Sequence, residues 1–232
     1  MTQRVRYELS DRTATIAMDD GKANALSFAM LDELNAAFER AEADHAGVVL
    51  TGRDGVLSGG FDLKILGAGG ADAARLVRTG FELVARVFAF PLPVVVACNG
   101  HAVAMGAFLA LAGEYRIATQ GAFKIGANEV AIGLTMPHFA VALCRERLSP
   151  THFHRAVALS EMFDPEGAVS AGFFDRIVPA GELAATATTA MAQLQRLNRA
   201  AHAATKARIR LDTLTKLRAG IEADDVELRA RL

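Results

Sequence analysis

The chain has 232 residues, of which 52% are hydrophobic, so its length and composition allow one large domain with a sizeable buried core. Its 25 Lys and Arg residues and 26 Asp and Glu residues give a formal net charge of −1, which provides no overall attraction to nucleic acid or to an anionic membrane. The longest apolar run, 91–98, is far too short to span a bilayer, and the N-terminal residues carry no apolar segment typical of a signal peptide. These features favour a cytoplasmic protein with no nucleic-acid and no membrane partner.

Cysteine and histidine usage gives no indication of a metal site. Cys98 and Cys144 each lie in an apolar stretch, which favours buried free thiols in a reducing compartment over a disulfide or a metal role. His152 and His154 are the closely spaced pair among the six histidines, and on a helix their side chains would point to different faces. We therefore expect no bound metal. The sequence also lacks a Walker loop, a dinucleotide-binding glycine motif and a nucleophile elbow.

The first half of the chain alternates between strand patterns and helix patterns. Period-two alternation indicates strands, and apolar residues at helical spacing after Ser27 indicate a helix that this serine can cap. The glycine-rich stretch 67–74 is typical of a mobile loop. In chain order, we expect a hairpin of strands at 5–9 and 13–18, a helix from 27, a buried strand at 47–52 and a second amphipathic helix at about 73–88.

The next part of the chain begins with a strand within 91–100 that ends at Asn99-Gly100, and the chain then becomes mostly helical. An apolar helix is expected at 104–112, short strands at 115–118 and 123–125, and mostly helices from Pro137 onward. No repeat of fixed period and no Pro- or Ser-rich linker divides the chain. Strands that alternate with helices, followed by a run of helices, predict an α/β core with a helical C-terminal part.

Two segments have an unusual backbone composition. Residues 58–62, Ser-Gly-Gly-Phe-Asp, follow a strand, and residues 99–107 join a buried strand to the start of a buried helix. A helix start leaves N–H groups unpaired and carries partial positive charge. If the two segments face each other, their N–H groups can bind one oxygen atom as an oxyanion hole. The pattern alone leaves open that both segments are ordinary tight turns.

Five segments, in order along the chain, resemble the enoyl-CoA hydratase/isomerase (crotonase) family. The resemblance covers nearly the whole chain and implies an α/β fold, a crotonase-like spiral of strand-strand-helix units with a C-terminal helical region. It also implies an acyl-CoA-binding core at 1–180 and a C-terminal helical assembly region at 181–232. The segments are 22–26 (KANAL), 58–62 (SGGFD), 99–118 (NGHAVAMGAFLALAGEYRIA), 123–133 (FKIGANEVAIG) and 168–179 (AVSAGFFDRIVP).

Carried over residue by residue, the resemblance implies an oxyanion hole that stabilises an enolate next to a thioester. Its two backbone donors fall at Phe61 and Met105, and the catalytic carboxylate falls at Glu129. Met105 stands where the family usually has glycine; it keeps an N–H, but a positive φ there would strain a methionine. Phe108 and apolar residues around Ile132 are expected to raise the pKa of Glu129 towards neutrality.

Phe108 is the larger departure, because the hydratases of the family have a second glutamate at this position. Hydration uses two carboxylates to hold and activate a water molecule, and phenylalanine has no proton to exchange. One base at Glu129 suffices to shift a double bond from position 3 to position 2 of an enoyl-CoA through a dienolate. The sequence therefore favours a 3-enoyl to 2-enoyl-CoA isomerase. A hydratase or other crotonase-type reaction and a non-catalytic acyl-CoA-binding protein stay as alternatives.

The resemblance also implies a set of contacts to an acyl-CoA thioester. Lysines would contact its phosphates, although each lysine is equally consistent with a solvated surface residue, and Asp62 is expected to anchor its loop rather than react. No separate cofactor is expected, because coenzyme A is part of the substrate. Family members usually assemble as trimers, so a homotrimer or a dimer of trimers is expected. The implied substrate-binding residues are Lys22, Ala23, Ala25, Gly60, Asp62, Lys64, Gly106, Phe108 and Lys206.

Overall fold

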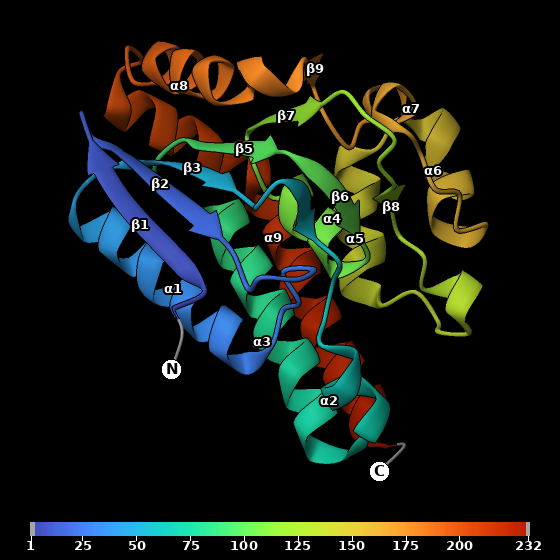
Figure 1. Cartoon of the computed structure of the whole chain (residues 1–232). Coiled ribbons are helices and arrows are strands. Elements are labelled where there is room, and N and C mark those ends of the chain that lie inside the picture. The colour runs from blue at the N-terminus through green and yellow to red at the C-terminus, as the bar shows by residue number, and fades with distance from the viewer. Residues whose placement is uncertain (1–2, 231–232) are drawn as a thin grey trace.

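The computed structural model describes residues 3–230, in which strands and helices alternate through most of the chain (Figure 1). The strands are β1 (Val5–Ser10), β2 (Thr13–Met18), β3 (Gly47–Thr51), β4 (Gly55–Ser58), β5 (Val94–Cys98), β6 (Gly100–Val103), β7 (Tyr115–Thr119), β8 (Ile125–Gly126) and β9 (Arg176–Val178). The α-helices are α1 (Phe28–Ala43), α2 (Leu63–Ala68), α3 (Gly70–Ala89), α4 (Met105–Leu111), α5 (His138–Arg147), α6 (Pro150–Ala158), α7 (Pro165–Ala171), α8 (Leu183–Leu194) and α9 (Arg199–Arg229). The 3-10 helices are η1 (Val130–Ile132) and η2 (Ala180–Glu182).

The strands form a large sheet and a small one. The large sheet has the order β1-β2-β3-β5-β7-β9, and the small sheet has the order β4-β6-β8. β1 and β2 are antiparallel, and the other paired strands are parallel. Along the chain, β3, β5 and β7 of the large sheet are each followed by one strand of the small sheet and then by a helix. The predicted spiral of strand-strand-helix units is therefore confirmed.

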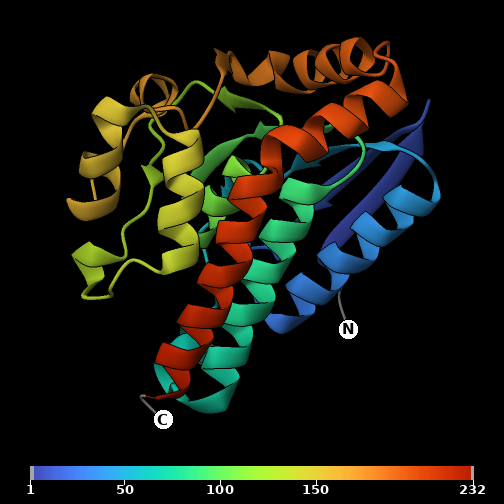
Figure 2. The same cartoon turned by 180° about the vertical axis from the view of Figure 1, so that it is seen from behind.

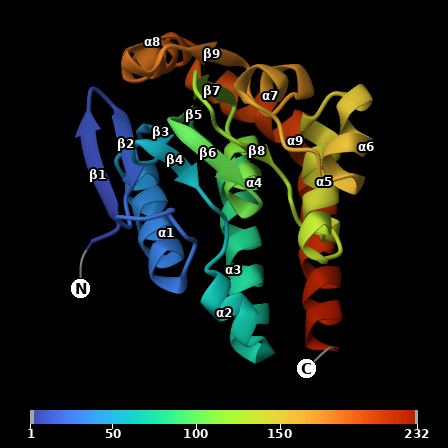
Figure 3. The ribbon, with the colours of Figure 1, turned by 45° about the vertical axis from the view of Figure 1, so that its right-hand side comes forward.

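The large sheet is covered on both faces because successive side chains of a strand point to opposite sides. Val48 and Leu50 of β3 pack into the main core with α1 and α3. Val49, between them, packs with Val95 of β5 against α8. Figure 3 shows α8 above this sheet and α1 and α3 below it. Because β3 is buried on both faces, its sequence is a nearly continuous run of apolar residues rather than an alternation of apolar and polar ones.

Short local signals in the first strands and helix are confirmed. The Ser27 side chain accepts the Met30 N–H at 3.3 Å and so caps α1, as expected. Asp11 and Arg12 form the hairpin turn between β1 and β2 and have φ values of 46° and 59°. A two-residue hairpin turn with both central residues at positive φ matches the twist of the two strands.

The stretch 67–74 differs from its prediction. It was expected to be a mobile loop, but α2 ends and α3 begins within it. Gly69 and Gly70 have φ values of 68° and 72°, so these two residues turn the chain from one helix into the next. The glycines therefore mark a tight turn between helices rather than a long loop.

The two C-terminal helices have different neighbours. α8 lies on the large sheet, whereas α9 runs along α3 and α5 (Figure 2). The Asp224 carboxylate of α9 accepts the backbone N–H groups of His138 and Phe139 at 2.8 and 3.0 Å, and so pairs donors that the start of α5 leaves free. The division into an acyl-CoA-binding core at 1–180 and an assembly region at 181–232 stays a prediction. Residues 1–2 of the first region and 231–232 of the second lie outside the described residues. Within residues 3–230, no helix is long and apolar enough to cross a membrane.

Candidate active site

Three segments that the sequence singled out follow the carboxyl ends of the strands of the small sheet (Figure 3). The loop 58–62 follows β4, the helix start 104–107 follows β6, and Glu129 follows β8, which ends at Gly126. The three strands are parallel neighbours, so these ends meet at one edge. The Ala104 N–H donates to the Gly126 carbonyl at 2.9 Å and joins the second and third segments directly. Open parallel sheets bind ligands at this edge.

The first loop presents the Phe61 N–H outward. The carbonyl oxygen of Gly60, in the same peptide unit, accepts the Leu26 N–H at 2.8 Å. Because the C=O and N–H of a trans peptide point in opposite directions, this bond turns the Phe61 N–H away from Leu26. Gly60 has φ of 98°, a conformation that favours glycine. Within residues 3–230, the Phe61 N–H donates to no protein acceptor.

The second donor lies at the first residue of α4. The Met105 N–H is one of the groups that a helix start leaves unpaired. The Ala104 carbonyl of the same peptide unit accepts the N–H groups of Ala107 and Phe108 at 2.9 and 3.2 Å, which directs the Met105 N–H out of the helix. The positive φ of this turn, 52°, falls on Ala104 and not on Met105. The strain considered for methionine therefore does not arise.

The two loops face each other at close range. A Cβ added to Gly60 would lie 3.1 Å from the Ala104 Cβ and 3.5 Å from the Met105 nitrogen. Gly106 also permits the approach, because a Cβ there would lie 2.2 Å from the Ser58 carbonyl oxygen. The unpaired N–H groups of Phe61 and Met105 thus lie on adjacent backbones, an arrangement that can bind one oxygen atom.

Glu129 is a buried carboxylate with an unpartnered oxygen. Its exposed fraction is 8%, and among residues 3–230 its Oε2 has no hydrogen-bond partner. Burial raises the pKa of Glu129 to about 7, in the direction expected from the sequence. Burial also raises the pKa of the Cys144 thiol in α5, and the negative charge of Glu129 adds to this effect. A carboxyl group with a pKa near 7 can accept and return a proton at neutral pH.

The cause of this burial differs in part from the prediction. Ile132 was expected to shield Glu129, but its side chain is 55% exposed because η1 turns it towards solvent. Phe108, on α4, is 1% exposed and lies in the same main core as Cys144. The interior side of the site therefore consists of α4 and α5, and the residues that follow Glu129 form its outer side.

Asn24 has a larger role than its place in a binding segment indicates. Its side chain is fully buried, and its Nδ2 donates to the Leu57 carbonyl at 3.1 Å. Its own carbonyl accepts the Ser58 hydroxyl at 2.8 Å, and the Ser58 Oγ accepts the Gly60 N–H at 3.2 Å. Asn24 thereby ties the segment 22–26 to the first loop. Its φ is 49°, a region that asparagine tolerates better than most residues, and this angle is seen only in the structure.

The candidate residues around the first loop lie at its surface. Lys22, Ala23 and Lys64 are exposed, and Ala25 is half-buried. Asp62 caps α2 by accepting the Lys64 N–H at 2.9 Å, and its expected role as the anchor of the first loop stays a prediction. The fold therefore brings these residues together with the loop that carries the Phe61 N–H.

Lys206 is not brought to this site. Its exposed fraction is 4%, and its Nζ donates to the Glu114 carboxylate at 2.7 Å and to the Leu92 carbonyl at 2.9 Å. Burial lowers the pKa of Lys206 to about 8, although Glu114 favours its charged form. Its ammonium group is engaged inside the protein, so Lys206 is not included in the proposed site.

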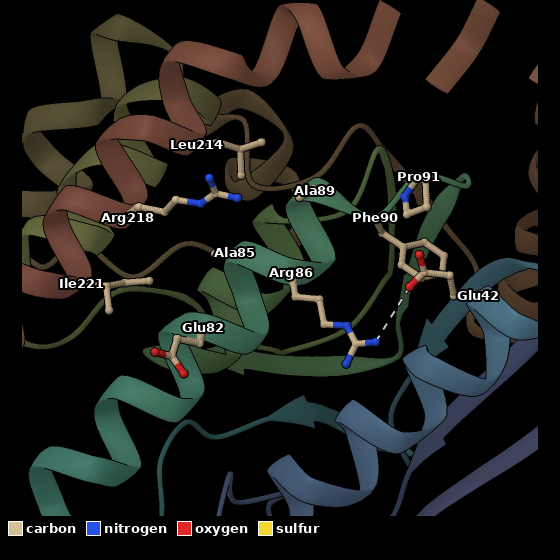
Figure 4. Close-up of a pocket in the computed structure, with 10 residues that line it drawn as sticks. All are labelled: Glu42, Glu82, Ala85, Arg86, Ala89, Phe90, Pro91, Leu214, Arg218 and Ile221. Carbon is tan, nitrogen blue, oxygen red and sulfur yellow. Dashed lines mark ion pairs between the residues drawn. The ribbon is translucent and has the colours of Figure 1, made fainter. Parts of the chain in front are cut away.

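A surface cavity of about 410 Å³ lies away from the candidate site, between α1, α3 and α9 (Figure 4). Arg86 points into it and pairs with Glu39 at 3.2 Å and with Glu42 at 3.9 Å. Arg218 approaches it from α9. None of the site residues predicted from the sequence lines this cavity.

Comparison with known proteins identifies the family. The family model for enoyl-CoA hydratase/isomerase matches residues 8–230. The human protein named enoyl-CoA delta isomerase 1, mitochondrial, is 33% identical over 96% of this chain and 76% of its own length. A protein of Mycobacterium tuberculosis named probable enoyl-CoA hydratase is 35% identical over 78% of this chain and 74% of its own length.

A solved structure has the same fold. The apo structure described as an enoyl-CoA isomerase of M. tuberculosis is 45% identical, with a TM-score of 0.94 over 98% of this chain and 100% of the other. The fold, the order of the matched segments and the extent of the family match agree. The chain therefore belongs to the enoyl-CoA hydratase/isomerase family, and it is an enzyme of that family.

Proposed function

We propose that this enzyme is an isomerase that moves the double bond of an acyl-CoA thioester from position 3 to position 2. The observation that carries the proposal is the buried carboxylate of Glu129, whose pKa is about 7 and whose Oε2 is unpartnered within residues 3–230. It follows the small sheet at the edge where the N–H groups of Phe61 and Met105 have no acceptor among residues 3–230. A base beside two convergent donors suits proton removal next to a thioester.

The proposed reaction is a proton transfer that leaves the substrate with the same atoms. The thioester oxygen accepts the Phe61 and Met105 N–H groups, and ionised Glu129 removes a proton from C2. The electron pair moves towards the carbonyl and forms a dienolate, whose oxygen is stabilised by the two donors. Protonated Glu129 then returns the proton to C4, and the remaining double bond lies between C2 and C3.

Hydration is the second candidate, because a relative named as a probable hydratase also matches this chain. Phe108 argues against it. At the position where the resemblance places a second glutamate, its ring is 1% exposed and has no proton to exchange. With one positioned carboxylate, the site can shuttle a proton but lacks the second group that would activate water.

Parallel assays with a 3-enoyl-CoA and a 2-enoyl-CoA test the proposal. We expect the 3-enoyl thioester to give the conjugated 2-enoyl product, seen as a rise in its ultraviolet absorbance. We expect the 2-enoyl thioester to lose no absorbance through hydration. Rapid hydration would show that the interpretation of Phe108 is wrong. Binding of both thioesters without any reaction would support a non-catalytic acyl-CoA-binding protein instead.

The coenzyme A part is proposed to lie along the segment 22–26 and the start of α2. Lys22 and Lys64 are exposed there and can approach its phosphates, and Ala23 and Ala25 can offer backbone contacts. We propose no cofactor other than the coenzyme A of the substrate. Residues 3–230 contain no cluster of three or more His, Cys, Asp or Glu side chains that could hold a metal ion.

We also propose that the enzyme assembles as a homotrimer or as a dimer of trimers. Ile209, Leu211 and Val226 of α9 are 69%, 62% and 67% exposed, so this helix carries apolar side chains that a neighbouring copy would cover. Light scattering should give three or six times the chain mass of 24.6 kDa. A stable monomer at micromolar concentration would contradict the proposed assembly.

A further inference from the structure

Gly80 of α3 lies directly against the side chains of both proposed oxyanion residues. A Cβ at this position would lie 2.3 and 2.5 Å from the Cε1 and Cζ atoms of Phe61 and 3.2 Å from the Cε of Met105. Contacts this short do not occur between real side chains, so the missing side chain of Gly80 creates a notch for the outer edge of the Phe61 ring. The Met105 side chain, which is 1% exposed, packs at the same notch.

The notch belongs to an apolar wall that runs from the first loop to α5. The Phe61 ring lies 6.1 Å from that of Phe81, which stacks on Phe139 at 4.5 Å. Phe139 is in the first turn of α5, which packs against α4. The wall therefore extends from the first loop into the protein interior as far as α5.

The opposite end of the first loop has different surroundings. A Cβ added to Gly59 would lie 3.4 Å from the Cβ and the carbonyl oxygen of Ala23. The loop thus has the proposed coenzyme A segment at its Gly59 end and the apolar wall at its Phe61 end. An acyl chain whose thioester is bound at the Phe61 N–H would pass the outer side of the half-buried Phe61 ring, because Phe81 and Phe139 behind it are 2% and 0% exposed and apolar surface is where a hydrocarbon tail is stabilised.

We propose that Gly80 determines which acyl chain lengths the enzyme accepts, because its notch keeps the Phe61 ring out of the path of the acyl tail. The proposal rests on the thioester position given in the proposed function. The Phe61 ring is half-buried and has Phe81 on its inner side, so its remaining free side faces outward. A side chain at position 80 would push the ring to that side, where it narrows the space for a long chain.

Binding of saturated acyl-CoA thioesters to the Gly80→Ala variant tests this proposal without requiring any reaction. We expect calorimetry to show that dodecanoyl-CoA binds about tenfold more weakly than to the wild type, while butanoyl-CoA changes by less than about twofold. Alanine favours the helical conformation more than glycine does, so α3 should form in the variant. Gly181→Ala is the matched control, because a Cβ at that position would meet no atom within 4 Å.

A double variant shows whether the effect acts through the ring. In Gly80→Ala/Phe61→Leu, the smaller side chain relieves the collision while the backbone N–H remains, so binding of dodecanoyl-CoA should recover. Equal weakening for both thioesters, or no recovery in the double variant, would overturn the role of Gly80. The enoyl-CoA assays separate the two proposals. If the wild type does not isomerise 3-enoyl-CoA but Gly80→Ala weakens binding of dodecanoyl-CoA alone, the isomerase proposal is wrong and the role of Gly80 is supported.

Discussion

Replacing Glu129 with glutamine is expected to remove nearly all isomerase activity while acyl-CoA binding remains close to that of the wild type. The amide keeps the shape of the side chain but can neither remove the proton from C2 nor return it to C4. Loss of a general base typically lowers a rate by about 10²–10⁴-fold, and a group that performs both transfers should reach the upper end. The measurements are kcat with a 3-enoyl-CoA and the dissociation constant of a saturated acyl-CoA.

The matched control for this variant is Glu182→Gln in η2, where the glutamate is exposed and far along the chain from the site. It should keep wild-type kcat. Full activity in Glu129→Gln would show that another group transfers the proton.

The rate of the wild type should also fall as the pH drops below about 7, because only ionised Glu129 can act as the base.

The stability of the same variant distinguishes lost chemistry from lost structure. The pKa of Glu129 in the folded protein, about 7, lies above its ordinary value of 4.5, so the folded state binds this proton more tightly than the unfolded chain does. The stability linked to this proton is therefore fully present below pH 4.5 and is lost as the pH rises through 7. The loss amounts to about 3 kcal/mol.

Glutamine cannot ionise and avoids this loss. Urea unfolding should therefore show a larger free energy of unfolding for Glu129→Gln than for the wild type at pH 8, and a much smaller difference at pH 5. A variant that is less stable than the wild type at pH 8 would show that burial does not destabilise the carboxylate. In that case, a loss of activity could reflect damage to the site rather than missing proton chemistry.

The elements of the candidate site were indicated by the sequence because each depends on a local motif. Glycines at 59–60 and the helix start after 99–103 are short-range features, and the fold only had to place them at one sheet edge. The exact location of the positive φ was not visible: it falls on Ala104 rather than on Met105, because α4 begins one residue later than that turn. The mobile loop predicted from the glycine-rich composition of 67–74 was also wrong, because two glycines are enough to turn the chain from α2 into α3.

Contacts between distant parts of the chain explain the other differences. Lys206 was a candidate for binding phosphate through the family resemblance, yet its partner Glu114 is 92 residues away. Gly80 likewise has no local signal, because its importance comes from Phe61 and Met105 on two other segments. Side chains become neighbours in this way only once the sheets and α9 are in place.

Removing the partner of Lys206 is expected to have the largest effect on stability. The Glu114 carboxylate accepts Lys206 Nζ at 2.7 Å and the Val94 N–H at 3.0 Å, and it contacts His202 Nε2 at 2.9 Å. Burial by itself raises the pKa of Glu114, but Lys206 and the other nearby cations outweigh it and hold the pKa below its ordinary value. Glu114→Ala leaves the ammonium group of Lys206 buried with the Leu92 carbonyl but without a carboxylate to balance its charge, which should lower the free energy of unfolding by about 3–5 kcal/mol.

The double variant Glu114→Gln/Lys206→Met separates the cost of an unpaired charge from the value of the ion pair itself. It removes both charges, keeps most of the side-chain volume and leaves an amide oxygen for the Val94 N–H, so it should recover much of the stability lost in Glu114→Ala. Asp72→Ala, which breaks the exposed Arg75–Asp72 pair, is the control and should change stability by less than about 1 kcal/mol.

The effect of Glu114→Ala should diminish as the pH falls below 4.5, the ordinary pKa of a glutamate, because protonation of Glu114 removes the negative charge that balances Lys206. Urea unfolding at neutral and acid pH measures both effects, and a Glu114→Ala variant as stable as the wild type at neutral pH would show that Lys206 finds water or another acceptor.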